Sequence, residues 1–330
     1  MASVDVLHDV DAGVALLAAG HLCAIPTETV YGLAANASDS DAVARVFEAK
    51  GRPHDHPLIV HVADAAAVYE WIHELPEWAV VLINAVWPGP LTVVGRRTPL
   101  ATDDITGGQD TVAVRVPQHP LTLELLNRLQ AQGIRGLVAP SANSFGHVSP
   151  TAAEHVAHEL GTYLSEHGDA ILDGGPCQVG VESTIVLATG DQPVILRPGA
   201  ITQYDIEHIT GVHVAESLGK TPRVSGALAS HYAPAARVVL VESDQLGDLI
   251  SGHAANRVGL IALANVVTPI GCVRLAMPET PQDFAAKLYS AMRAADEQGL
   301  EVIFVIAPVG TGIERAIADR LARAAAHVEG

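Results

Sequence analysis

One aperiodic stretch constrains this chain more than any other feature, because it separates two series of helices and strands. It is AESLGKTPRVSGALASHYAPAA, residues 215–236, which is rich in Gly, Ser, Ala and Pro and lacks hydrophobic periodicity. Such a composition is typical of a linker. We therefore predict two domains, residues 1–214 and residues 237–330. The linker ends in His231 and Tyr232, which are unexpected residues for a linker that only connects two domains.

The first domain is predicted to be mixed α/β. Hydrophobic periodicity and capping residues predict helices over residues 9–20, 40–50, 65–72, 77–86, 119–132, 149–160 and 201–210. Short apolar runs predict strands over residues 21–27, 57–62, 91–97, 111–117, 135–143, 170–174, 182–188 and 194–199. The last three strands follow one another without a helix between them, which favours antiparallel pairing.

The second domain alternates strands and helices regularly. Strands are expected over residues 237–243, 257–264, 272–277 and 301–309, and helices over residues 244–252, 281–299 and 313–326. This alternation predicts a small parallel, Rossmann-like domain. It carries no cluster of catalytic residue types, and its GTGIER turn lacks a complete phosphate-binding pattern.

Composition disfavours several classes of function. The 330 residues carry a formal net charge of −18, which argues against a standing complex with nucleic acid or acidic membrane. No apolar run approaches the roughly 20 residues that span a bilayer. The N-terminal residues MASVDVLHDVDAG carry acids where a signal peptide carries bases, so we expect a cytoplasmic protein. The cysteines form no CxxC pair, which favours reduced thiols over a disulfide framework or a zinc site.

Several of the 19 basic residues stand in short polar motifs at predicted strand ends. KGRP at residues 50–53, VRVP at 114–117 and LRPG at 196–199 each place a cation beside a turn. The planar fork of Arg52, between a glycine and a proline, suits phosphate or carboxylate oxygens. For Lys50, an exposed cation complementing a helix dipole is the alternative.

Two further stretches place polar residues next to apolar strands. IPTETVYG puts two threonines, a glutamate and a tyrosine after an apolar run, before an expected turn at Gly32. VESTIV buries Glu182 within a predicted strand. A buried acid is costly, so Glu182 needs a positive partner or a ligand.

Three more features have both a functional and a structural interpretation. SANSFG, residues 141–146, offers hydroxyls and amides to a ligand, although a plain turn explains it equally well. Ser149 precedes a predicted helix, where capping is the ordinary role. His61 is flanked by apolar residues, which fits either a site residue or a hydrogen-bonded core histidine.

Taken in order along the chain, these motifs resemble those of the threonylcarbamoyl-AMP synthase family, which has the YrdC-type fold. The matching stretches are PTETVYGLAAN, KGRP followed by PLIVHV, TVAVRVP, APSAN, VESTIV, LRPG and SHYAP. The linker and second domain resemble the long, two-domain form. The resemblance implies a twisted mixed sheet enclosing a large cleft, followed by a smaller Rossmann-like domain.

The resemblance also implies a reaction. L-threonine, bicarbonate or CO2, and ATP would give threonylcarbamoyl-adenylate and pyrophosphate, with Mg2+ carried by ATP. A separate tRNA threonylcarbamoyl-transferase machinery would then modify the adenosine next to the anticodon, giving t6A. The RNA would not be held by this protein, in keeping with its negative charge.

Residue roles follow from the same resemblance. The residues expected to contact L-threonine are Thr29, His61, Arg115, Ser141 and Ser183. Those expected to contact ATP are Arg52, His56, Thr111, Ala139, Asn143, Ser149, Arg197 and Tyr232, with Lys50 and Arg52 as catalytic cations. The family more often has asparagine at the position of His56. The linker is expected to fold back over the cleft as a lid, positioned by the second domain.

Two alternatives remain at this point. Hydrogenase-maturation carbamoyltransferases contain a similar domain and form carbamoyl-adenylate, but they also carry zinc-finger segments with paired CxxC motifs, which this chain lacks. A non-catalytic RNA-binding module would use the cleft only as a basic surface, which the net charge disfavours.

Overall fold

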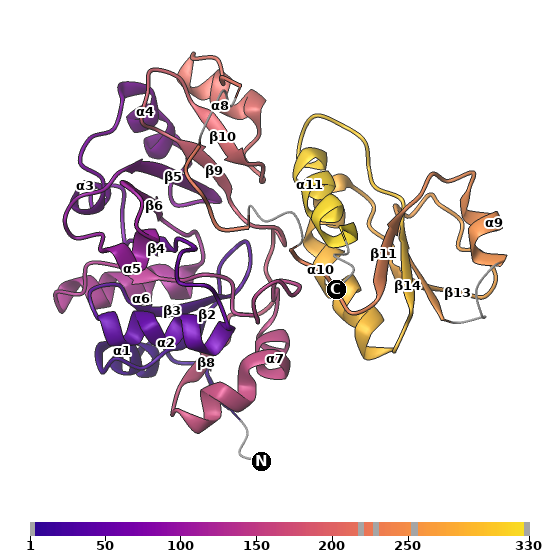
Figure 1. Ribbon diagram of the computed structural model, residues 1–330, viewed down its shortest axis with the longest axis horizontal. Helices are drawn as coiled ribbons and strands as arrows, with labels where there is room; N and C mark the ends of the chain where they lie inside the picture. The colour runs from indigo at the N-terminus through magenta and orange to yellow at the C-terminus, as the bar shows by residue number, and fades with distance from the viewer. Residues whose placement is uncertain (1–3, 217–220, 227–230, 252–256, 327–330) are drawn as a thin grey trace.

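The computed structural model describes residues 4–216, 221–226, 231–251 and 257–326 (Figure 1). One sheet is formed by strands that precede the predicted linker in the chain, and a second sheet by strands that follow it. The linker has neither helix nor strand in its described residues. Whether the two parts fold as independent domains stays a prediction. No helix in the described residues is long and apolar enough to cross a membrane.

The larger sheet is mixed, as the sequence predicts. Its strand order is β1 (Asp5–Leu7), β8 (Ala170–Leu172), β2 (Cys23–Ile25), β3 (Gly32–Asn36), β7 (Leu137–Val138), β4 (Ile59–His61), β6 (Thr111–Arg115), β5 (Leu91–Arg96), β9 (Thr184–Leu187) and β10 (Val194–Arg197). Antiparallel pairing of the last three strands is right only for β9 and β10. Strand β8 instead pairs in parallel with β1 and β2, because its three apolar residues are all buried and suit an interior position.

Helices cover both faces of this sheet. They are α1 (Val10–Ala18), α2 (Ser40–Lys50), α3 (Val68–Trp71), α4 (Glu77–Val86), α5 (Asp103–Thr106), α6 (Pro120–Ala131), α7 (Ala153–Glu166) and α8 (Gln203–Thr210). One apolar cluster joins α1 and α6 to β2 through Leu17, Leu125 and Ile25. A larger cluster joins α2, α3, α4 and α7 to the sheet.

Strand β3 was not expected from the sequence, which predicts a turn at Gly32. Gly32 instead begins β3, and its backbone runs so close to Ala139 that an added Cβ would lie 3.0 Å from that residue's Cβ. Glycine is needed here for close packing rather than for a turn. The expected strand over 135–143 is shorter in the structure, where β7 covers only Leu137–Val138.

The smaller sheet is parallel, as predicted. Its order is β11 (Arg237–Leu240), β14 (Val302–Val305), β12 (Val258–Ile261) and β13 (Cys272–Ala276), with helices α9 (Leu246–Ser251), α10 (Pro281–Glu297) and α11 (Glu314–Ala325). Helices α10 and α11 lie between this sheet and the larger part of the molecule (Figure 1). The apolar cluster around these two helices includes Val30, Val148 and Val181 from the first domain, so the two domains bury apolar surface against each other.

The end of α2 brings two cations inward. Asp39 caps the start of the helix by accepting hydrogen bonds from the amides of Asp41 and Ala42. Gly51 ends it in the left-handed conformation, at φ 59°. This turn leaves both Lys50 and Arg52 buried, so the alternative interpretation of Lys50 as an exposed helix-end cation is wrong.

Candidate active site

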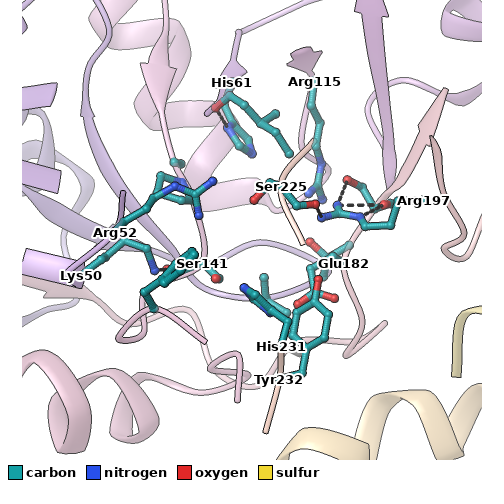
Figure 2. Close-up of a pocket in the computed structure, with 17 residues that line it drawn as sticks. Lys50, Arg52, His61, Arg115, Ser141, Glu182, Arg197, Ser225, His231 and Tyr232 are labelled. Carbon is teal, nitrogen blue, oxygen red and sulfur yellow. Dashed lines mark hydrogen bonds between the residues drawn. The ribbon is translucent and has the colours of Figure 1, made fainter. Parts of the chain in front are cut away.

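A polar pocket lies where the strand ends of the larger sheet meet the linker (Figure 2). In this view Lys50 and Arg52 lie on one side, Arg115 and Arg197 on the other, and Tyr232 closes the side toward the second domain. The described residues that line it are Thr29, Val30, Lys50, Arg52, Ile59, His61, Arg115, Ala139, Pro140, Ser141, Phe145, Glu182, Ser183, Arg197, Ser225, His231 and Tyr232. Its cavity volume is about 40 Å³, which is room for about three water molecules.

The pocket is strongly cationic and incompletely satisfied. Burial lowers the pKa of Lys50 well below its ordinary value, and the charge of Arg52 lowers it further. Burial also lowers the pKa of Arg52 to about 10. The buried Nε atoms of Arg52 and Arg115 have no hydrogen-bond partner among the described residues. Buried cations with free donors favour an anionic ligand.

Lys50 also holds the SANSFG loop, residues 141–146, in place through hydrogen bonds. Its Nζ donates to the backbone carbonyls of Ser141 and Asn143. The Asn143 side-chain amide donates to the carbonyls of Ser144 and His147, at 2.7 and 3.0 Å. The loop is therefore tied to the end of α2, which holds Ser141 at the pocket wall.

The PTETVYG segment divides its polar residues between structure and pocket. Thr27 builds the turn, because its Oγ1 accepts from the amides of Thr29 and Val30 and donates to the Val30 carbonyl. Tyr31 donates its hydroxyl to the Gly175 carbonyl at 2.8 Å, away from the pocket. Thr29 is the residue of this group that lines the pocket.

Glu28, the glutamate of the IPTETVYG stretch, serves the site indirectly, a role that the sequence analysis did not assign to it. Its Oε1 lies 2.7 Å from Nη2 of Arg115, and its Oε2 accepts from the amide of Gln118 at 3.0 Å. Both side chains of the pair are only 5% exposed. A buried carboxylate thus orients the arginine and leaves its Nε without a protein partner.

His61 is a neutral imidazole in this pocket. Its Nδ1 lies 3.2 Å from the Ile59 carbonyl, so Nδ1 carries the proton and Nε2 is left as an acceptor. Burial lowers its pKa to about 3, and the charge of Arg115 acts in the same direction. His61 can therefore accept a hydrogen bond from a ligand near neutral pH.

The linker residues pack into the pocket from the second domain's side. Tyr232 is fully buried and adopts a left-handed backbone, at φ 63°, which is uncommon for a bulky residue. Its ring stacks on Tyr289 of α10 at a centroid distance of 5.7 Å. His231 lies edge-on to the Phe145 ring at 6.0 Å. The backbone of this segment is strained and held by packing from both sides.

Two family models match the chain. The Sua5/YciO/YrdC model, described as telomere recombination, matches residues 15–199, and the model described as threonylcarbamoyl-AMP synthase, C-terminal domain, matches residues 201–326. The chain belongs to the threonylcarbamoyl-AMP synthase family. It has the two-domain form that the sequence motifs indicate.

The threonylcarbamoyl-AMP synthases that this chain matches align with nearly its whole length. It is 41% identical to a threonylcarbamoyl-AMP synthase of Bacillus subtilis, over 94% of this chain and 91% of that protein. It is 39% identical to one of Pyrococcus abyssi, over 93% and 91%. A crystal structure of P. abyssi Sua5 complexed with L-threonine matches with a TM-score of 0.84 and 36% identity, over 96% of this chain and 94% of that one.

The pocket brings together ten of the fourteen residues that the threonylcarbamoyl-AMP synthase motifs single out. The four outside its lining are His56, Thr111, Asn143 and Ser149. His56 stacks edge-on against Phe145 at 5.2 Å, and Thr111 lines an adjoining hollow that shares Ile59 and Ser225 with the pocket. The binding roles of all fourteen stay predictions.

Ser149 does not cap a helix, contrary to the ordinary interpretation of its position. Helix α7 has Ala152 at its N-cap and no side-chain cap. The Ser149 hydroxyl instead donates to Oε1 of Glu182 at 2.6 Å. Glu182 is the single acid among the described lining residues of the synthase pocket, and its positive partner is Arg320 of the second domain.

Proposed function

We propose that this protein condenses L-threonine, bicarbonate or CO2, and ATP into threonylcarbamoyl-AMP and pyrophosphate. The observation that carries the proposal is the pocket itself, in which buried cations with free donors surround a neutral histidine and a row of hydroxyl groups. These groups suit two anionic ligands in one site, an amino acid carboxylate and a polyphosphate. The named relatives of the whole chain support this choice of reaction.

The threonine end is formed around Arg115. A guanidinium already fixed by Glu28 suits the substrate carboxylate, because a planar fork binds carboxylates with directional hydrogen bonds. Thr29 and Ser183 contribute hydroxyls, and Ser141 also lines the pocket. The acceptor nitrogen of His61 suits a donor on threonine, either the hydroxyl or the amine.

The ATP end is formed by Lys50, Arg52 and Arg197. The threonine amine forms a bond to the carbon of CO2 and loses a proton, giving a carbamate anion. A carbamate oxygen then attacks the α-phosphorus, and the bond to pyrophosphate breaks. Lys50 and Arg52 stabilise the charge that passes to the leaving group. No general base is assigned, since the attacking oxygen is already anionic and positioning supplies much of the rate.

Mg2+ is proposed to enter as part of the ATP substrate. Mg2+ is usually held by one or two carboxylates together with substrate phosphates. The described residues contain no group of three metal-ligating side chains. The pocket carboxylate, Glu182, already accepts three hydrogen-bond donors, so the phosphates themselves suit the metal better than this chain does.

The linker is proposed to act as a lid. Tyr232 lines the pocket and its ring stacks on Tyr289 of the second domain, so we infer that the linker moves when the nucleotide enters. Returning to cover the product would exclude water from a labile mixed anhydride. The product would pass in the cytoplasm to a tRNA threonylcarbamoyl-transferase machinery, without a stable complex between this acidic chain and RNA.

The decisive experiment measures pyrophosphate release from ATP and bicarbonate with each amino acid in turn, with mass spectrometry of the nucleotide product. Threonine-dependent release of a threonylcarbamoyl-adenylate is expected. Release that ignores threonine and responds to carbamoyl phosphate would favour the carbamoyltransferase alternative. RNA binding without any release would favour the non-catalytic module.

A further inference from the structure

Binding of threonine and ATP does not by itself account for the Glu182 carboxylate in the pocket. Glu182 lines the same cavity as Lys50, Arg52 and Arg197. An uncompensated negative charge here would repel the phosphates of ATP and weaken the field of the cations. The structure must therefore either neutralise Glu182 or turn it away from the ligand.

The second domain supplies most of the groups that hold this carboxylate. Nε of Arg320, on α11, lies 2.8 Å from Oε2 of Glu182. The hydroxyl of Tyr289, on α10, lies 3.0 Å from the same oxygen and 3.3 Å from Oε1. Ser149 is the donor from the first domain, at 2.6 Å from Oε1.

Arg320 contacts several parts of the chain, and its Nη1 also donates to Oδ2 of the neighbouring Asp319 at 2.5 Å. It is fully buried, and its Nη2 donates to the carbonyl of Pro198, next to the pocket residue Arg197, at 3.0 Å. Its guanidinium lies over the Tyr232 ring, 5.4 Å from the centroid. One side chain of the second domain thus contacts the pocket acid, the end of β10 and the linker.

The ionisation state of Glu182 is consistent with its contact to Arg320. Burial acts to raise the pKa of Glu182, but the charges of Arg320 and then Arg197 outweigh it, and the pKa is about 2. Glu182 is therefore ionised at neutral pH, and its charge is balanced mainly from the second domain.

We propose that Arg320 and Tyr289 are positioning residues for the nucleotide pocket, which neutralise and orient Glu182 so that the pocket presents a net positive charge to the ATP phosphates. The second domain then completes the electrostatics of the site, beyond placing the linker. This inference rests on the proposed ATP-dependent function.

The test measures binding of MgATP and of adenosine by calorimetry to the full chain and to Arg320→Met. Adenosine lacks the phosphates, so a charge effect weakens ATP alone, whereas a packing defect weakens both ligands. We expect the dissociation constant for ATP to rise about tenfold or more and that for adenosine to stay within about twofold. The exposed pair of Arg257 and Glu301 offers a matched control, since Arg257→Met removes an arginine of the same domain that does not line the pocket.

Charge rescue separates the proposal from a purely structural role. Adding Glu182→Gln to Arg320→Met removes the unbalanced charge while keeping an acceptor for Ser149 and Tyr289, so ATP affinity should return to within about threefold of the parent. Equal impairment of the single and double variants, or unchanged ATP affinity in Arg320→Met, would overturn the proposal.

Removing one partner of a buried pair can prevent folding, and if Arg320→Met cannot be purified, Tyr289→Phe is expected to weaken ATP binding about threefold with adenosine unaffected. Unchanged ATP affinity in that variant would also reject the idea. A parent protein that binds ATP but makes no threonylcarbamoyl-adenylate would overturn the proposed function alone, and one that binds no ATP would overturn both.

Discussion

The Arg115 guanidinium and the Glu28 carboxylate form a buried pair, with 2.7 Å between Nη2 and Oε1, at the end of the pocket that we assign to threonine. Glu28→Gln keeps the acceptor for the amide of Gln118 but removes the charge that orients Arg115. We expect KM for threonine to rise about tenfold and KM for ATP to stay within about twofold. Steady-state pyrophosphate release measures both constants.

The matched control for that variant is Glu124→Gln, which alters an exposed pair with Arg128 and should change neither constant. A lower KM for threonine in Glu28→Gln would show instead that Glu28 competes with the substrate carboxylate for Arg115.

ATP binding should be accompanied by proton uptake at Lys50. Its pKa is lowered by burial and by Arg52 in the ligand-free pocket, and an adjacent polyphosphate favours the charged form. Calorimetry at pH 8.5 in two buffers of different ionisation enthalpy measures the protons taken up. Lys50→Arg keeps a permanent charge and should bind ATP with less uptake. Equal uptake in both proteins would assign the proton to another group.

Acid should destabilise the fold through His61. Its pKa is about 3 in the folded chain and 6.5 when unperturbed, so the unfolded chain binds more protons between these values. The contribution of His61 is therefore complete above pH 6.5 and is lost as the pH falls toward 3. Between pH 7 and pH 5 the free energy of unfolding should fall by about 2 kcal/mol more in the parent than in His61→Gln. Urea unfolding at the two pH values measures this difference, and parallel losses in both proteins would contradict it.

The lid is tested through the fate of the product. Tyr232→Ala removes a ring that contacts both Arg320 and Tyr289, and should open the pocket to water. We expect the ratio of AMP to threonylcarbamoyl-AMP to rise several-fold, because water then hydrolyses the mixed anhydride. Chromatography of the nucleotides over time measures the ratio. Tyr204→Ala, at an exposed tyrosine of α8, is the control, and an unchanged ratio in Tyr232→Ala would rule out a protective lid.

Local signals in the sequence predicted most elements well. Helices α2 and α4 have the predicted bounds, residues 40–50 and 77–86, because periodicity and caps act within a few residues of one another. The wrong predictions involve distant partners. Gly32 begins a strand because Ala139 packs against it, and Ser149 leaves the helix start because Glu182 accepts its hydroxyl.

The sequence by itself determined the family, the mixed and parallel sheets, and most residues of the pocket, since each depends on motifs and hydrophobic patterns that are local along the chain. Only the tertiary structure decided that Lys50 is buried and that Glu28 holds Arg115. It also supplied the partner that the buried Glu182 required, Arg320, 138 residues further along. The contact between Glu182 and Arg320 depends on how the two domains pack together, and no local sequence pattern encodes that packing.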